Sequence, residues 1–210
     1  GPVTIDLSQE MDGSTVNSLS GVTVGANNVT NSSVDADGVI DINAATDITN
    51  SVFKGDAAGV TAVDLLAGDG GIRNVDVFAL AGAAALDAET EIDATDVQAL
   101  LNITARAGDA ISASSFTTET GNLDIDADNG DIVGSVFYAK AGLADITVGD
   151  EFDGSVVETL GSIDVAASWI NGSTFVSESG YVDLEATAGD IVASSATAKL
   201  ANVIALASSD

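Results

Sequence analysis

A six-residue phrase recurs ten times along the chain at a nearly constant step. It consists of a large apolar residue, any residue, a small residue or Asn, usually Ser, any residue and a second apolar residue. The first copy is Met11–Val16 and the last is Ile191–Ala196. The other copies begin at Val29, Ile48, Ile72, Ile92, Ile111, Ile132, Phe152 and Ile170. The average step is about 20 residues, a period that predicts a stacked solenoid.

A second phrase lies between the copies of the first and shows which kind of solenoid to expect. It begins with Gly and then alternates apolar and polar residues, as in Gly121–Ile125 and Gly180–Leu184. Alternation with period two is typical of a β-strand with one buried face. Each strand finds its best match one repeat away instead of within its own repeat, which favours coiling over hairpins. We therefore predict an all-β, single-stranded parallel β-helix (a β-solenoid), expected to be right-handed, with about ten turns of about two strands and a length of about 48 Å.

The period runs through the chain without a linker, so we expect one domain. Gly1-Pro2 is typical of the remnant of a cleaved expression tag, and residues 3–210 are read as one continuous solenoid segment. Neither end of this segment carries a recognisable cap, although open sheet edges are normally covered. We therefore expect it to be an excerpt from a longer repeat array.

The charge balance limits the classes of partner. The chain has 33 acidic and 5 basic residues, a formal net charge of −28, and no Cys. Such a field repels nucleic acid and anionic lipid, and it leaves divalent cations as the natural small partners. No run of 18 apolar residues occurs, so direct membrane insertion of this segment is not expected. Without Cys there is no disulfide, no thiol chemistry and no structural zinc site of the cysteine type.

An acidic residue recurs at the outward position of the first strand of the repeat. This column is read as Asp6, Asp41, Asp64, Asp87, Asp124, Asp164 and Asp183, with Thr23, Thr104 and Thr147 in other turns. Stacked like charges repel, so either water screens them or a cation bridges neighbouring turns. We favour a solvated acidic stripe and keep calcium bridging as the alternative.

One acidic segment has the residue types of a metal site. Asp124, Asp126, Asp128 and Asp131 alternate with other residues in a way that resembles the opening of an EF-hand calcium loop. The match is incomplete, because Gly130 comes one place late and the twelfth position is Ser135 instead of Glu. A strand that enters an Asp-rich corner explains the same run, and we favour that interpretation over the calcium site.

The hydroxyl column of the first phrase is interpreted as structural. It comprises Ser14, Ser32, Ser51, Thr95, Ser114, Ser135, Ser155, Ser173 and Ser194, and Val75 is the exception. The chain contains no His that could activate a nucleophile and no Gly-x-Ser-x-Gly elbow. We expect a ladder of hydroxyls that bond the neighbouring backbone. Paired carboxylates are the one catalytic option left, and we expect no enzymatic activity, no catalytic residue and no cofactor other than calcium.

The aromatic residues divide into two groups. Phe53, Phe116, Phe137 and Phe175 occupy an apolar position of the phrase and are expected in the core. Trp169 and Tyr181 fall beside core positions, and so does Tyr138. Outward rings can stack on sugars, so Trp169 and Tyr181 are candidate glycan contacts, although a Trp that packs on a corner fits equally well.

The repeat pattern as a whole resembles that of the filamentous haemagglutinin type of large bacterial surface proteins. The resemblance rests on Gly-x-apolar-x-apolar, as in Gly161–Val165, followed by a small-residue corner and a second apolar strand. It implies a right-handed parallel β-helix that is secreted or held at the bacterial cell surface. The function it implies is a structural rod or stalk of an adhesin, or an extracellular biofilm scaffold, which contacts cell-surface or matrix glycans or proteins. Two alternatives stay open: a carbohydrate-binding or carbohydrate-active β-helix module, and a calcium-linked sheath or surface-layer component.

Overall fold

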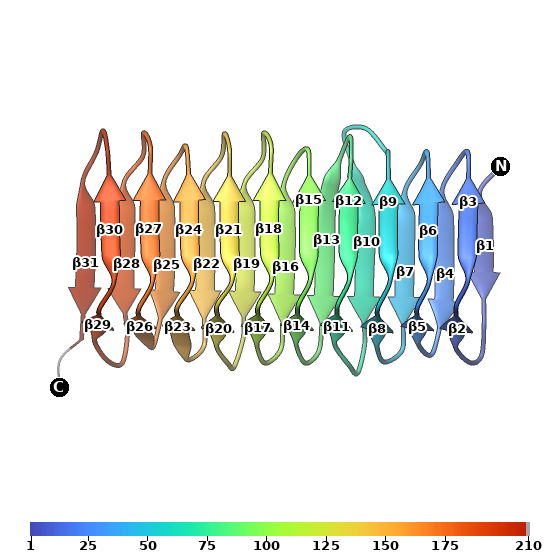
Figure 1. The fold of residues 1–210 in the computed structure, drawn as a ribbon, viewed down its shortest axis with the longest axis horizontal. Helices are drawn as coiled ribbons and strands as arrows, with labels where there is room; N and C mark the ends of the chain where they lie inside the picture. Colours follow the sequence, from blue (N-terminus) through green and yellow to red (C-terminus); the bar gives the residue numbers. More distant parts are fainter. Residues whose placement is uncertain (209–210) are drawn as a thin grey trace.

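The chain is an all-β solenoid of about ten turns of about 20 residues. The computed structural model describes residues 1–208. Its strands form three parallel sheets, one of 11 strands and two of 10 strands, and each turn contributes one strand to each sheet in succession. Figure 1 shows the turns stacked along one axis, with the first and last strands at opposite ends of the rod. The predicted fold class is confirmed.

The three sheets differ in strand length. Sheet A consists of β1 (Val3–Asp6), β4 (Val22–Ala26), β7 (Ile40–Ala44), β10 (Thr61–Ala67), β13 (Ala83–Ala88), β16 (Ile103–Ala107), β19 (Leu123–Ala127), β22 (Ala144–Val148), β25 (Ile163–Ala167), β28 (Val182–Ala186) and β31 (Val203–Ala207). Sheet B consists of β2 (Met11–Asp12), β5 (Val29–Thr30), β8 (Ile48–Thr49), β11 (Ile72–Arg73), β14 (Ile92–Asp93), β17 (Ile111–Ser112), β20 (Ile132–Val133), β23 (Glu151–Asp153), β26 (Trp169–Asn171) and β29 (Ile191–Val192). Sheet C consists of β3 (Thr15–Ser18), β6 (Ser33–Ala36), β9 (Val52–Gly55), β12 (Asp76–Ala79), β15 (Asp96–Ala99), β18 (Ser115–Thr118), β21 (Val136–Ala139), β24 (Val156–Thr159), β27 (Thr174–Ser177) and β30 (Ser195–Ala198).

Each turn has three strands where the sequence predicts about two. The recurring phrase is split by a corner: its first apolar residue lies in a short strand of sheet B and its last lies in sheet C. In the sixth copy, Ile111 belongs to β17 and Phe116 to β18. The corner lies at Ala113, whose φ of 47° is left-handed. A two-residue strand shows no alternation of its own, and for that reason the pattern did not reveal sheet B.

The same corner conformation recurs in every turn and explains the small residue in the phrase. Left-handed backbone is accessible to Gly and tolerated by Asn, but it is costly for other residues. The ten corner residues have φ values between 47° and 58° and are Gly13, Asn31, Asn50, Asn74, Ala94, Ala113, Gly134, Gly154, Gly172 and Ala193. Seven of the ten are Gly or Asn, so three alanines occupy strained backbone.

The core is a single column of apolar side chains that runs the length of the rod. In β19, Leu123, Ile125 and Ala127 point inward and are buried, whereas Asp124 and Asp126 point outward. The same alternation extends along sheet A as far as β28. The core positions that the period-two pattern predicted are therefore confirmed in these turns.

Phenylalanines pack across turns in the C-terminal half of the core. The rings of Phe116 and Phe137, both in sheet C, stack with centroids 5.4 Å apart. The next turn has the smaller Val157 in sheet C and Phe152 in sheet B. The ring centroid of Phe152 lies 6.2 Å from that of Phe137 and 5.5 Å from that of Phe175. A ring from sheet B therefore fills the space beside Val157. Close packing of this kind holds the turns in register.

One turn departs from the regular pattern. Between β9 and β10 the chain makes an extra loop through Gly59, visible in Figure 1 as the largest excursion beyond the ends of the strands. Strand β10 has seven residues, and its register with β13 shifts between Thr61 and Val63. The irregularity does not interrupt sheet A, because β10 still pairs with β7 on one side and with β13 on the other.

Candidate functional site

The hydroxyl column forms a hydrogen-bonded ladder inside the corner between sheets B and C. The Ser155 hydroxyl donates to the carbonyl oxygen of Asp153 at 3.0 Å. The Ser155 Oγ also accepts the backbone N–H of Ser135 from the preceding turn at 3.1 Å. The same link between turns, at 3.0–3.3 Å, joins Ser14 to Ser32, Ser32 to Ser51, Thr95 to Ser114, Ser114 to Ser135, Ser155 to Ser173 and Ser173 to Ser194. These hydroxyls form hydrogen bonds with backbone groups, and their role is therefore structural.

Val75 divides the ladder in two. Its side chain is buried at the ladder position and offers no acceptor to the backbone N–H of Ser51. Val75 follows the irregular turn, and it lies 24 residues after Ser51 instead of about 20. The interruption therefore coincides with the extra loop.

The acidic stripe on sheet A consists of two columns, which corrects the single column expected from the sequence. Asp124, Asp145, Asp164 and Asp183 lie directly opposite one another on four consecutive strands. Asp41 and Asp64 form a second stack in the same column, with Thr23 and Thr104 at other turns. The residues two places further along the strands are Asp6, Asp87 and Thr147, and they form a separate column with Asp126.

Stacking perturbs the carboxyl groups of the first column. Partial burial raises the pKa of Asp164 above its usual value, and the carboxylates of Asp145 and Asp183 raise it further. Burial likewise raises the pKa of Asp64, with a contribution from Asp41 and Asp87. Both shifts have the sign expected for like charges on a partly desolvated surface.

The four candidate calcium ligands do not converge. Asp124 and Asp126 point outward from β19 in separate columns. Asp128 accepts from Arg106, whose Nε lies 3.2 Å from Oδ2, and Asp131 Oδ1 accepts the backbone N–H of Glu151 at 2.9 Å. Among residues 1–208, no group of three or more Asp, Glu, His or Cys side chains is placed to share a metal ion. Calcium binding at this segment stays a prediction.

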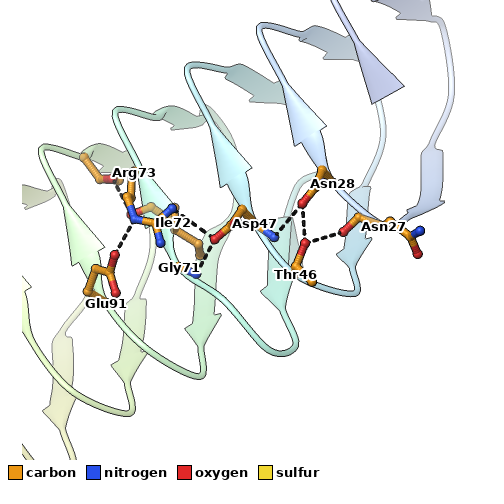
Figure 2. A network of polar contacts seen from close by, with 9 residues as sticks. Asn27, Asn28, Thr46, Asp47, Gly71, Ile72, Arg73 and Glu91 are labelled. Atoms are coloured by element: carbon orange, nitrogen blue, oxygen red, sulfur yellow. Dashed lines mark hydrogen bonds and ion pairs between the residues drawn. The ribbon is translucent and has the colours of Figure 1, made fainter. Parts of the chain in front are cut away.

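Each basic residue pairs with an acidic residue of an adjacent turn. Arg73 lies between two turns: Nη1 is 3.0 Å from Asp47 Oδ1, and Nε donates to Glu91 (Figure 2). Asp47 Oδ1 also accepts the backbone N–H of Gly71 at 3.1 Å. The remaining pairs are Lys54 with Asp35, Arg106 with Asp128, Lys140 with Glu119 and Lys199 with Glu178.

The sequence did not predict these pairs. The available signal was the separation of about one turn between each base and an acid. Most of these side chains are substantially exposed, so the pairs contribute little to stability individually. Their main effect is to neutralise the acidic surface locally.

Trp169 and Tyr181 are both at the surface, with 44% and 43% of their area exposed. Trp169 lies in β26, and its ring covers Gly189, where an added Cβ would come within 2.3 Å of the ring. Tyr181 directly precedes β28, at the opposite end of the sheet A strands from Trp169. The structure therefore does not bring the two rings together, and their contact with a glycan stays a prediction.

Shallow hollows mark the faces of sheets A and C. One of about 490 Å³ lies on sheet A over Gly25, whose missing side chain leaves a gap between Asp6 and Asn43. A hollow of about 300 Å³ on sheet C is lined by Tyr138, Glu158 and their neighbours. The sequence identified Tyr138 as outward but did not predict a hollow beside it.

Comparison of the chain with protein-family models, with curated proteins and with solved structures finds no match. Residues 1–208 contain no helix long and apolar enough to span a membrane. The function of the chain must therefore be inferred from the geometry of its hydroxyl ladder and its surface.

Proposed function

We propose that the chain is a structural rod: a stalk segment of a large secreted or surface-attached bacterial adhesin or extracellular matrix scaffold. The observation that carries this proposal is the unbroken order of parallel strands in three sheets along the rod. A rod of about ten turns at about 4.8 Å per turn acts as a spacer about 48 Å long.

The bonds between turns favour a rigid rod that resists mechanical force. In every sheet, consecutive turns are joined by parallel strand pairing, and at the corners the hydroxyl ladder adds side-chain bonds between turns. Displacement of one turn relative to the next breaks all of these bonds together. Solenoids resist such displacement because each turn is stabilised mainly by its two neighbours.

The surface charge supports a rod that stays separate from its neighbours. A net charge of −28 favours solubility and opposes sideways association of parallel rods. The resemblance to filamentous haemagglutinin repeats is consistent with a location outside the cell.

The spacer role is tested by measuring the length and rigidity of the rod. The chain has no Cys, so Thr15→Cys with Ser195→Cys places two spin labels in one column of sheet C, on the first and last strands. We expect one narrow distance near about 43 Å, nine strand spacings. A broad or much shorter distribution would contradict a rigid spacer.

Two further measurements address the alternatives. Antibodies against the rod should label intact cells that express the parent protein, and labelling only after permeabilisation would contradict a surface location. Incubation with neutral and acidic polysaccharides should release no sugar. Sugar release that disappears when one carboxylate pair is replaced by amides would establish an enzyme instead.

A calcium-linked assembly is the second candidate, and the four stacked aspartates from Asp124 to Asp183 favour it. A cation that binds the folded stack in preference to the unfolded chain raises the melting temperature. We expect a modest rise in millimolar calcium relative to sodium chloride of the same ionic strength. Equal melting curves in the two salts would remove this candidate, because screening alone acts equally in both.

A further inference from the structure

Three hollows lie in one line along the outer face of sheet C, and we call this line of hollows the groove. Its walls are two columns of outward side chains: the third residue of each sheet C strand, and the residue that follows the strand. The fourth strand residue points inward between them, as Ala79, Ala99 and Ala139 do, and leaves a low floor. The two wall columns are two residues apart along each strand, a spacing of about 7 Å between their Cα atoms.

Three separate hollows on sheet C are segments of this groove. The first is about 210 Å³ and is lined by Asn17, Ser18, Leu19, Asp35 and Asp37. The second is about 170 Å³ and is lined by Ala79, Leu80, Gln98, Ala99, Leu100, Thr117 and Glu119. The third is about 300 Å³ and is lined by Tyr138, Lys140, Glu158, Thr159, Leu160, Val176 and Glu178. In each hollow the wall residues come from the same two columns, so the three hollows share one axis.

The groove carries an excess of negative charge. Its two wall columns carry six carboxylates, at Asp35, Asp37, Asp56, Glu119, Glu158 and Glu178, and three lysines, at Lys54, Lys140 and Lys199. Ion pairs with lysines engage Asp35, Glu119 and Glu178. Within residues 1–208, Asp37, Asp56 and Glu158 have no ion-pair partner. A ligand that brings positive charge would complement these three positions.

The third hollow combines that charge with an aromatic ring and aliphatic surface. Tyr138 and Glu158 are direct neighbours on β21 and β24, and Val176 follows Glu158 on β27. Tyr138 is 38% exposed, and the exposed Leu160 lines the same hollow. An exposed ring binds a cation over its face, a carboxylate pairs with the same cation, and the aliphatic side chains cover a hydrocarbon stem. Lys and Arg side chains present all three complementary features.

We infer that this groove, with Tyr138 and Glu158 at its centre, binds a lysine- or arginine-bearing segment of a partner protein. The exposed ring, the unpaired carboxylate and the aliphatic surface of the third hollow together select a basic side chain. The acidic surface repels nucleic acids and anionic glycans. The inference goes beyond the proposed rod function, because the rod would span the same distance with its groove empty.

Binding is tested with a fluorescent ten-residue peptide of alternating Lys and Ser, measured by anisotropy in 0.15 M salt. We expect saturable binding that Tyr138→Ser and Glu158→Gln each weaken by about threefold, the size expected for one exposed cation–π contact or ion pair. Tyr138→Phe keeps the ring and should bind like the parent. Circular dichroism establishes that each variant is folded, and the fully acetylated peptide should not bind.

The matched control separates this groove from diffuse attraction to an acidic rod. Glu185→Gln makes the same chemical change on the outward face of sheet A, away from the groove. We expect it to leave the affinity for the peptide unchanged. Equal weakening by Glu185→Gln and Glu158→Gln, or the absence of saturable binding, would overturn the inference. A neutral linear oligosaccharide that binds in place of the peptide, and loses affinity in Tyr138→Ser, would also overturn it in favour of a glycan groove.

Discussion

The backbone N–H of Ser135 donates to the Oγ of Ser155, one turn further along the rod, at 3.1 Å. The two residues lie where the chain bends between sheets B and C, and both are buried. The sheets do not supply this N–H with a carbonyl partner, and burial without a partner is costly. The hydroxyl of one turn therefore completes the hydrogen bonding of the turn before it.

Ser155→Ala tests the contribution of the ladder to stability. The substitution leaves the Ser135 N–H and the Asp153 carbonyl without the hydroxyl that now bonds both. We expect the free energy of unfolding to fall by about 1–3 kcal/mol, the usual cost of an unsatisfied buried polar group. Urea titration measures the change. The outward Ser33→Ala is the control, and a loss of equal size there would argue against a special role for the ladder.

Val75→Thr should extend the N-terminal segment of the ladder by one hydroxyl. Thr95 already occupies the same position one turn later, so the corner accepts a β-branched hydroxyl. The new hydroxyl would accept the N–H of Ser51, and we expect the free energy of unfolding to rise by up to about 1 kcal/mol. The same exchange at the inward Val77 places a hydroxyl in the apolar core and should lower stability. If both variants were destabilised equally in urea, the predicted bond to Ser51 would not form.

Ala113→Gly should relieve strain at a corner. Ala113 has a φ of 47°, a conformation that costs a residue with a Cβ about 1–2 kcal/mol. Part of this stabilisation is lost, because glycine increases the conformational entropy of the unfolded chain. We expect a net rise in the free energy of unfolding of up to about 1 kcal/mol, measured as a higher urea midpoint. In β25, Ala166→Gly lacks the relief of strain and should lower the midpoint; a rise there would contradict the explanation.

Asp164→Asn should stabilise the rod in a pH-dependent way. The pKa of Asp164 is raised in the folded rod by burial and by Asp145 and Asp183, so its protonated form is favoured by folding. The stabilisation from that protonated form is complete below the ordinary value of 3.8 and is lost as the pH rises through the folded pKa.

The variant should therefore melt above the parent at pH 7, and the difference should shrink toward pH 3. Thermal melts of both proteins across this range measure the effect. Asp69→Asn removes an exposed carboxylate outside the stack and is the control. A difference between Asp164→Asn and its parent that does not depend on pH would contradict the stacking explanation.

Ile125→Asp should disrupt the stack at its centre. Ile125 is 1% exposed, and a carboxylate there has no partner among the surrounding apolar side chains. We expect a loss of several kcal/mol, seen as loss of the β circular dichroism signal or a large fall in melting temperature. Thr104→Asp adds the same side chain on the outward face of sheet A and should have a small effect. Parent-like melting of Ile125→Asp would contradict its place in the core.

Several parts of the candidate sites could be read from residue types and spacing. The Ser and Thr of the ladder positions recur at the period of the repeat, and the small corner residues recur with them. Tyr138 could be placed outward because its neighbour Phe137 occupies a core position. The groove beside it could not be predicted, because its walls belong to residues about 20 and 40 positions apart that meet only when the turns are in register.

The sequence by itself determined the period of the solenoid and the inward or outward direction of the strand residues in sheets A and C. Both follow from local alternation, since an apolar residue such as Ile125 has only one face on which it can be buried. Only the tertiary structure decided the alignment of the turns. A shift of two residues keeps every side chain on the same face, so alternation cannot distinguish Asp87 opposite Asp64 from Asp87 opposite Leu66, the pairing that the structure has. The lengths of the corners and the packing between turns make that choice, and these are contacts between residues far apart in the chain.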